Sequence, residues 1–274
     1  MSENELNKFL HNTLFKFEEV SEWTPRFRGS SLPICPRQIM LGKFFDGELT
    51  KTRTFEDLYN YHVGQALHVL VQRAWTRQGL LWGDWRCLDS KHCGMVFNNT
   101  ALQQCPRCRS ELVYIKKNLV DKDTGYTGHC DGVVFCEELG GYLVYHLKSR
   151  NNNVIKKKRG HNPYPNDLHR VSASATIISR KHWVPIAGRL ILWLGKPSAK
   201  PYLFWYYPGR GEELYTKQAE TVSKMEIVLS DKGPLAVAHL CESVEDARTC
   251  PFGPICFSPN CDKLILEKYH EFIV

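Results

Sequence analysis

Eleven cysteines lie along this 274-residue chain, at spacings that suit metal ions better than disulfides. A reducing compartment keeps thiols free, and an odd number of cysteines cannot pair completely. Two of the cysteines, separated by five residues, precede a Cys-Pro-Arg-Cys segment. Four thiolates suit tetrahedral zinc, and a Cys-x-x-Cys turn close to a second cysteine pair is typical of a zinc ribbon. We therefore predict structural Zn²⁺ held by Cys87, Cys93, Cys105 and Cys108.

A second group of reactive side chains lies on a predicted β-hairpin that turns at Gly140-Gly141. Side chains alternate along a strand, so His146 and Lys148 share one face, and Asp131 opens the preceding strand. An acid, an imidazole and an ammonium group around one point suit phosphodiester hydrolysis, in which carboxylates hold a divalent ion and a lysine stabilises developing negative charge. Plainer interpretations exist for the same residues, because Asp131 could begin a turn and Lys148 could protect a strand edge.

Three motifs around these residues resemble those of the RecB/Cas4 branch of the PD-(D/E)XK nucleases. Gly128-His129-Cys130-Asp131 is similar to the family's GxxD motif, and His146-Leu147-Lys148-Ser149 lies where the family has Glu-x-Lys. Upstream, Gly64-Gln65-Ala66-Leu67-His68 is similar to its helical GxxxH motif. The resemblance implies an α/β fold with a restriction-endonuclease-like core, in which a central mixed sheet is flanked by helices. It also implies a catalytic site that holds Mg²⁺ or Mn²⁺ and consists of Asp131, Lys148, His146 and His68.

The chain departs from the family pattern at three positions. His146 replaces the usual glutamate, and an imidazole supplies no negative charge and suits Mg²⁺ poorly. Ser172 and Thr176 fall where the following helix of the family has Gln and Tyr. Whether the site is catalytically active is therefore left open by the sequence.

The resemblance also covers cysteines near the two ends of the chain. One N-terminal and three C-terminal cysteines ligate a [4Fe-4S] cluster in the Cas4- and AddB-type members, the last two five residues apart. The corresponding residues here are Cys35, Cys241, Cys250 and Cys256, with Cys261 as a rival to Cys241. Four soft thiolates suit either such a cluster or zinc.

Periodicity predicts the elements that must position these residues. We expect helices at about 3–20, 54–79, 168–180 and 212–229, strands at 133–135, 142–147, 189–194 and 202–207, and a polar loop at 150–167. The cysteine-bearing segment at 85–112 shows no regular period. The predicted organisation is an N-terminal helical part (1–84), an inserted zinc ribbon (85–112), the nuclease-like core (113–235) and an iron-sulfur segment (236–274).

A basic run gives the chain a candidate surface for a polyanion. The net charge is +7, and the cations concentrated beside Arg150 are Lys156, Lys157, Lys158 and Arg159. A polyanion is the partner that such a run would bind, although a basic run can also be a solvated loop. The resemblance to the RecB/Cas4-type nucleases implies that this partner is DNA, as single strands or ends. The sequence shows no apolar stretch of membrane-spanning length and no signal peptide, so we expect a cytoplasmic protein without a membrane partner.

Three functions are compatible with these features. The first is a metal-dependent DNA nuclease of replication, recombination or repair. The second is a catalytically degenerate descendant that binds DNA or a replication, recombination or transcription partner. The third is a zinc-ribbon transcription accessory factor. Trp183, Trp205, Tyr206 and Tyr207 could stack on bases, although alternating aromatics on a strand are more often core residues.

Overall fold

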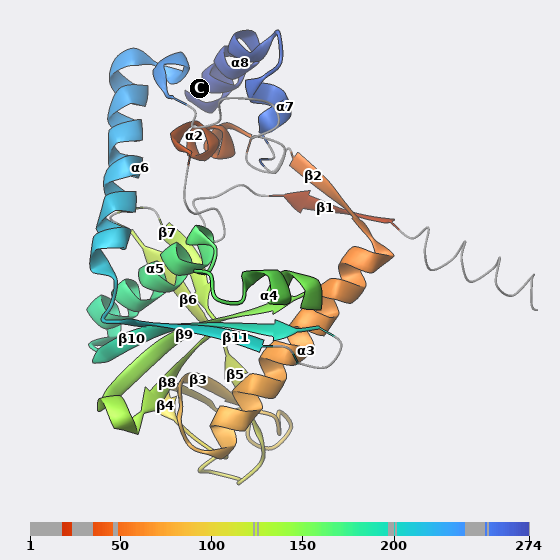
Figure 1. Cartoon of the computed structure of the whole chain (residues 1–274), viewed down its shortest axis with the longest axis vertical. Helices are drawn as coiled ribbons and strands as arrows, with labels where there is room; N and C mark the ends of the chain where they lie inside the picture. Colours follow the sequence, from red (N-terminus) through yellow and green to blue (C-terminus); the bar gives the residue numbers. More distant parts are fainter. Residues whose placement is uncertain are drawn as a thin grey trace, which may run out of the picture. The chain divides into compact units, whose positions relative to one another are not determined.

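The structure is a computed structural model, and it describes residues 18–23, 35–45, 49–122, 124, 126–196, 200, 202–238, 250 and 252–273 (Figure 1). The chain forms two compact units. The first consists of Met1–Leu58, Asp123–Gly125 and Thr216–Val274, and the second of Tyr59–Lys122 and Tyr126–Tyr215. No helix of the described residues is both long and apolar enough to cross a membrane.

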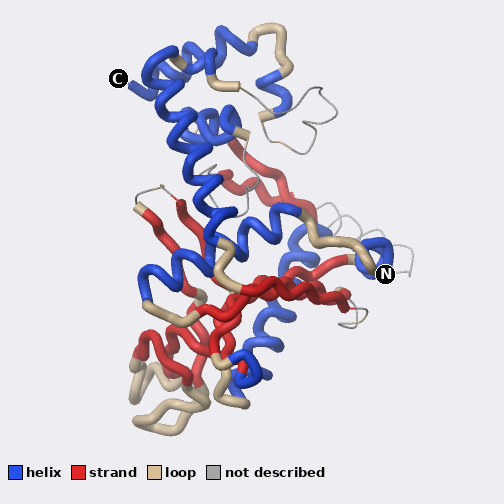
Figure 2. The backbone as a smooth tube through the Cα atoms, turned by 60° about the vertical axis from the view of Figure 1, so that its left-hand side comes forward, coloured by secondary structure: helices blue, strands red, loops and turns tan. Residues whose placement is uncertain are grey.

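The second unit is built on a mixed seven-stranded sheet with helices on either side, drawn in Figure 2 with red strands and blue helices. The strand order is β11-β10-β9-β8-β3-β4, and β5 pairs with β3. β9 and β10 are parallel, whereas the other neighbours are antiparallel. The strands are β3 (Leu81–Cys87), β4 (Val96–Ala101), β5 (Leu112–Ile115), β8 (Gly132–Cys136), β9 (Gly141–Arg150), β10 (Ile186–Gly195) and β11 (Tyr202–Pro208). A separate two-stranded sheet pairs β6 (Lys117–Asp121) with β7 (Tyr126–Cys130). The expectation of an α/β fold with a central mixed sheet flanked by helices is confirmed at this level.

The predicted hairpin is present and supplies the centre of the sheet. β8 and β9 are joined by a 3-10 turn at Glu137–Leu139, followed by Gly140 in the left-handed region (φ 57°). Tyr145 and Leu147 of β9 pack into an apolar cluster with Leu67 of helix α3 (Phe55–Arg77). The alternate residues of β9 face helix α5 (Pro165–His182), where His146 meets Ser174. Each face of β9 thus belongs to a different helix.

Helix α3 begins where the sequence predicts. The Thr54 hydroxyl accepts the backbone N–H of Asp57, and the Asp57 carboxylate accepts the backbone N–H of Thr54, which forms a reciprocal cap. Gly64 lies against β9, because a Cβ there would be 2.9 Å from the Ser149 hydroxyl. The absence of a side chain at this position therefore lets the helix approach the sheet.

Two expectations about local structure are wrong. The segment at 85–112 contains the regular strand β4, and the expected boundary at 84/85 falls inside β3, which pairs with β8. The cysteine region is thus an extension of the central sheet. The polar segment at 150–167 contains helix α4 (Asn152–Lys158), because the Asn151 side chain accepts the backbone N–H of Asn153 and caps it.

The described residues of the other unit include a short hairpin and several helices. β1 (Glu18–Trp23) pairs antiparallel with β2 (Leu49–Thr54). The helices are α2 (Pro36–Phe44), α6 (Glu212–Lys232, which starts in the second unit), α7 (Gly253–Cys256) and α8 (Cys261–Ile273). Arg37 of α2 donates to the carbonyl of Val237 at 2.7 Å, so residues 200 apart in the sequence are joined. Most of the helix expected at 3–20 lies outside the described residues, and its last residues, from Glu18, form strand β1.

Candidate functional site

The four cysteines of the predicted zinc ribbon converge on one point. Sγ of Cys87 lies 3.4 Å from Sγ of Cys108, and Sγ of Cys93 lies 3.6 Å from Sγ of Cys105. All four sulfur atoms lie within 4.8 Å of one another. These residues can therefore hold a metal ion, and four thiolates at this spacing suit tetrahedral coordination.

Backbone geometry around the four cysteines supports this arrangement. Gly94 (φ 55°) directly follows Cys93, and Arg109 (φ 61°) directly follows Cys108. Both have a left-handed backbone conformation, so the chain turns sharply after each of these cysteines. The hydroxyl and the backbone N–H of Ser110 hydrogen-bond to Cys108 and lower the pKa of its thiol to about 6. A metal-binding thiol must lose its proton, so these contacts prepare Cys108 as a ligand.

A second centre forms around Asp131, between β7 and β8. The residue is 4% exposed, and its Oδ2 accepts hydrogen bonds from His146 Nδ1 at 2.9 Å and from the Leu147 backbone N–H at 3.1 Å. Burial alone would raise the pKa of Asp131, but His146, His68 and Arg170 hold it well below its usual range. Asp131 is therefore an ionised carboxylate inside the protein.

His146 has a protein partner at each ring nitrogen. Because a carboxylate only accepts hydrogen bonds, Nδ1 donates to Asp131, and Nε2 lies 3.1 Å from the hydroxyl of Ser174 on α5. Burial lowers the pKa of His146, which is 0% exposed, so the ring is neutral and Nε2 accepts from Ser174. In this state neither ring nitrogen of His146 offers a lone pair to a metal ion.

The other oxygen of Asp131 faces His68 and Lys116. His68 Nδ1 lies 3.6 Å away and Lys116 Nζ lies 3.5 Å away, and His68 Nδ1 is buried without a hydrogen-bond partner in the described part of the chain. Burial lowers the pKa of His68 to about 4, although Asp131 acts in the opposite direction. His68 is thus a neutral imidazole beside a carboxylate oxygen, which is a pairing that a metal ion could use.

Lys148 and Arg150 extend along β9 from His146 and meet another buried acid, Asp167. Lys148 Nζ lies 4.0 Å from Asp167 Oδ1, and Arg150 Nη2 lies 3.3 Å from Asp167 Oδ2, which also accepts from Trp193 Nε1. Burial and then Arg170 lower the pKa of Lys148 to about 8. Arg150, which is also predicted to bind nucleic acid, pairs with Asp167 and stacks on Trp193 at 4.7 Å. Its charge is therefore engaged within the protein.

Ser172 and Thr176 are buried on α5 and serve the fold. Ser172 accepts from Arg189 of β10 and donates to the Leu168 carbonyl, and Thr176 lies 3.5 Å from the Arg210 carbonyl. The helix residue that reaches His146 is Ser174, between them, which sequence reasoning missed.

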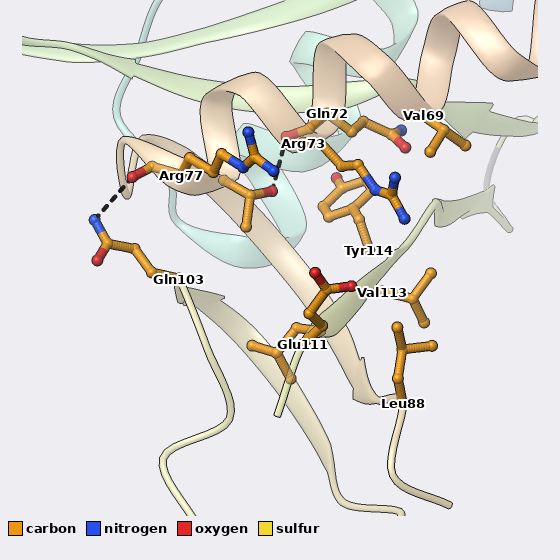
Figure 3. A pocket seen from close by; sticks show the side chains of 11 residues that line it. Val69, Gln72, Arg73, Arg77, Leu88, Gln103, Glu111, Val113 and Tyr114 are labelled. Carbon is orange, nitrogen blue, oxygen red and sulfur yellow. Dashed lines mark hydrogen bonds between the residues drawn. The ribbon is translucent and has the colours of Figure 1, made fainter. Parts of the chain in front are cut away.

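Sequence reasoning also missed four residues around these centres, namely Lys116, Asp167, Arg170 and Gln72. Gln72 donates to the Asp131 carbonyl at 3.0 Å and lies one helical turn after His68, a spacing that could have indicated it. Gln72 also lines a pocket of about 170 Å³ between the second half of α3 and β5 (Figure 3). Arg73 and Arg77 line this pocket from the helix, and Glu111 lines it from the opposite side. The pocket is a neighbour of the Asp131 centre, in contact with it through Gln72.

Four cysteines also gather in the first unit. Burial raises the pKa of the Cys256 thiol to about 11, and Cys261, Cys250 and Cys35 act in the same direction. These thiols therefore lie within electrostatic reach of one another. Cys241, expected as the fourth iron-sulfur ligand, lies outside the described residues, whereas its rival Cys261 opens helix α8 and acts electrostatically on the Cys256 thiol.

The basic run forms the end of helix α4. Lys156, Lys157 and Arg159 are exposed, and the salt bridges between described residues include none of them. Lys158 differs, because its Nζ lies 4.5 Å from the Tyr164 ring centre and donates to the Asn162 carbonyl. Three exposed cations of this run are thus available to an anionic partner.

Neither the models of known protein families nor the curated protein sequences compared with this chain give a match. The function must therefore be inferred from the chemistry of these sites.

Proposed function

We propose that this chain is a DNA-binding protein built on a nuclease-like core of the RecB/Cas4 type, in which the Asp131–His146 pair has replaced the magnesium site. The observation that carries the proposal is the double engagement of His146 with Asp131 and Ser174. Mg²⁺ requires about six oxygen ligands in near-octahedral geometry and usually binds through carboxylates. Here the one carboxylate at the centre has an oxygen occupied by protein donors, and the neighbouring Lys116 adds positive charge.

DNA binding is assigned to the end of helix α4. Its exposed cations would displace counterions from phosphates, and each neutralised phosphate adds about 0.9 to the slope of log affinity against log salt. Because Lys158 is held by Tyr164, we expect about three effective contacts in this helix. Replacing the basic run with alanine should flatten the salt slope by about 3. An unchanged slope would show that the basic residues of α4 are solvated and do not contact DNA.

A cleavage assay tests the catalytic part of the proposal. We expect labelled single-stranded and double-stranded DNA to bind in Mg²⁺ and to remain uncut. Cleavage in Mg²⁺ that disappears in both Asp131→Asn and Lys148→Gln would contradict the proposal, since it would show that the centre holds a productive magnesium ion.

A second candidate function, a nuclease that uses Mn²⁺ or a softer ion, is supported by His68. A neutral imidazole whose buried nitrogen has no hydrogen-bond partner among the described residues, 3.6 Å from an ionised carboxylate oxygen, fits two ligands of such an ion. A bound divalent ion would polarise the phosphate and lower the pKa of water. Lys148, with its pKa lowered to about 8, would stabilise negative charge on the phosphate from the same strand. Cleavage in Mn²⁺ alone, lost in His68→Gln, would favour this candidate.

The two cysteine sets are proposed to have different metals. Structural zinc is assigned to the set at the end of β3, whose ligands hold the strands of the cysteine region. A [4Fe-4S] cluster is assigned to the set that contains Cys35, Cys250, Cys256 and Cys261, where it would join the N-terminal helix α2 to α7 and α8. A replication, recombination or transcription protein remains a proposed partner of this chain.

A further inference from the structure

Three aromatic side chains lie exposed in a row on strand β11, which forms one edge of the central sheet. Tyr202, Phe204 and Tyr206 are 54%, 64% and 42% exposed, and alternate residues of a strand share a face. Trp205, between them, points the other way, where it packs on Trp193 and donates to the His161 carbonyl. The row is therefore separate from the aromatic core on the opposite face of the sheet.

The row lies on the same face of the sheet as helix α3, close to the Asp131 centre. Phe204 pairs with Leu192 of β10, and Leu192 pairs with Leu147 of β9, whose backbone N–H donates to Asp131. Two strand spacings place Phe204 about 10 Å from Leu147 along the sheet. A ligand lying along the row would thus pass beside the nuclease-like centre.

A cationic pocket lies at the Tyr202 end of the row. Tyr202 pairs with Leu194, two residues before Lys196. The pocket has a volume of about 230 Å³ and is lined by Tyr59, Asn60, Val63, Asn151, Asn152 and Lys196, none of which is acidic. Lys196 Nζ donates to Asn60 Oδ1 at 2.7 Å, and Asn152 Oδ1 is buried with no hydrogen-bond donor among the described residues. The pocket therefore offers positive charge and hydrogen-bonding groups next to exposed aromatic rings.

We propose that Tyr202, Phe204 and Tyr206 form a stacking platform for the bases of single-stranded DNA, and that the Lys196 pocket receives the backbone at its end. The inference rests on the proposed DNA binding and narrows its substrate to unpaired strands. Successive side chains on one face of a strand are about 6.7 Å apart. This spacing leaves room for one base, about 3.4 Å thick, between two neighbouring rings. Bases inside a duplex are already stacked on their neighbours, so the platform would select single strands.

The experiment measures the affinity of the full-length protein for a fluorescein-labelled oligothymidylate of about 15 nucleotides, by anisotropy in EDTA. Tyr202→Ala, Phe204→Ala and Tyr206→Ala should each raise Kd about tenfold. Phe204→Trp should retain affinity, whereas Phe204→Leu, which is apolar but has no aromatic face, should bind as weakly as Phe204→Ala. Trp183→Ala is the matched control, because Trp183 is 89% exposed and lies outside the row. The control should bind like wild type.

A direct readout accompanies the affinities. Photocrosslinking to an oligonucleotide that contains 5-bromodeoxyuridine should label the peptide with residues 202–208. The proposal is overturned if Phe204→Leu binds like wild type, because the surface would then be apolar without stacking. It is also overturned if the alanine variants change self-association and leave DNA affinity intact, since that result assigns the row to a second copy of the chain. If DNA binding depends on α4 but not on the row, the stacking platform is refuted and the proposed DNA-binding function stands. If the wild-type protein has no affinity for DNA, the stacking platform and the proposed function are both refuted.

Discussion

Replacing His146 with glutamate tests whether the Asp131 centre is a converted metal site. The introduced carboxylate would lie beside Asp131 Oδ2, which now accepts from His146 Nδ1 at 2.9 Å, in a position that is 0% exposed. Two buried carboxylates this close cannot both be ionised without a cation. Without metal the variant should therefore lose stability.

The size of the loss follows from the burial of the pair. Replacing His146, a hydrogen-bond donor to the buried Asp131 carboxylate, leaves that charge uncompensated, which costs about 3–5 kcal/mol and lowers Tm by about 6–20 °C for a chain of this size. If the two carboxylates form a magnesium site, Mg²⁺ at one hundred times its Kd should restore about 2.7 kcal/mol. The measurement is urea or thermal unfolding of His146→Glu in EDTA and in Mg²⁺.

His146→Gln is the matched control for this measurement. A neutral amide removes the imidazole and adds no anionic ligand, so any stability that His146→Gln loses should not be recovered in Mg²⁺. The reasoning is refuted if His146→Glu is as stable as wild type in EDTA, or if Mg²⁺ stabilises both variants equally.

Three further predictions concern the other titratable and metal-binding groups. Because the pKa of His68 is lowered to about 4 in the folded state, its stabilising contribution is complete above pH 6.5 and decreases as the pH falls towards 4. In EDTA, unfolding titrations should therefore show that wild type loses about 2 kcal/mol more than His68→Gln between pH 7 and pH 5. If Cys261 is the fourth iron-sulfur ligand, Cys261→Ser should remove the visible absorption and iron of anaerobically purified protein, and Cys241→Ser should retain both. Cys108→Ser should lower the zinc content from about one ion per chain without lowering the iron content, by metal analysis, and an equal loss of iron would count against separate metal sites.

The spacing of chemical groups along the sequence was sufficient to predict the local features of this protein. The Cys87–Cys108 set was recognisable because its ligands lie close together in the chain, so that local turns alone bring them near one another. The reciprocal cap at Thr54 and the hairpin turn at Gly140 were predictable for the same reason. In contrast, helix α4 was missed because its seven residues are too few to show a helical period.

Only the tertiary structure decided what the central residues contact. The sequence placed His146 and Asp131 near one another, but only the fold brings Ser174 of α5 to the other ring nitrogen of His146. The aromatic residues of β11 divide in the same way: Trp205 packs on Trp193 on one face of the sheet, and Phe204 on the other face remains exposed. Strand periodicity separates the two faces of a sheet, but it does not say which face a helix covers, because that depends on packing between segments far apart in the chain.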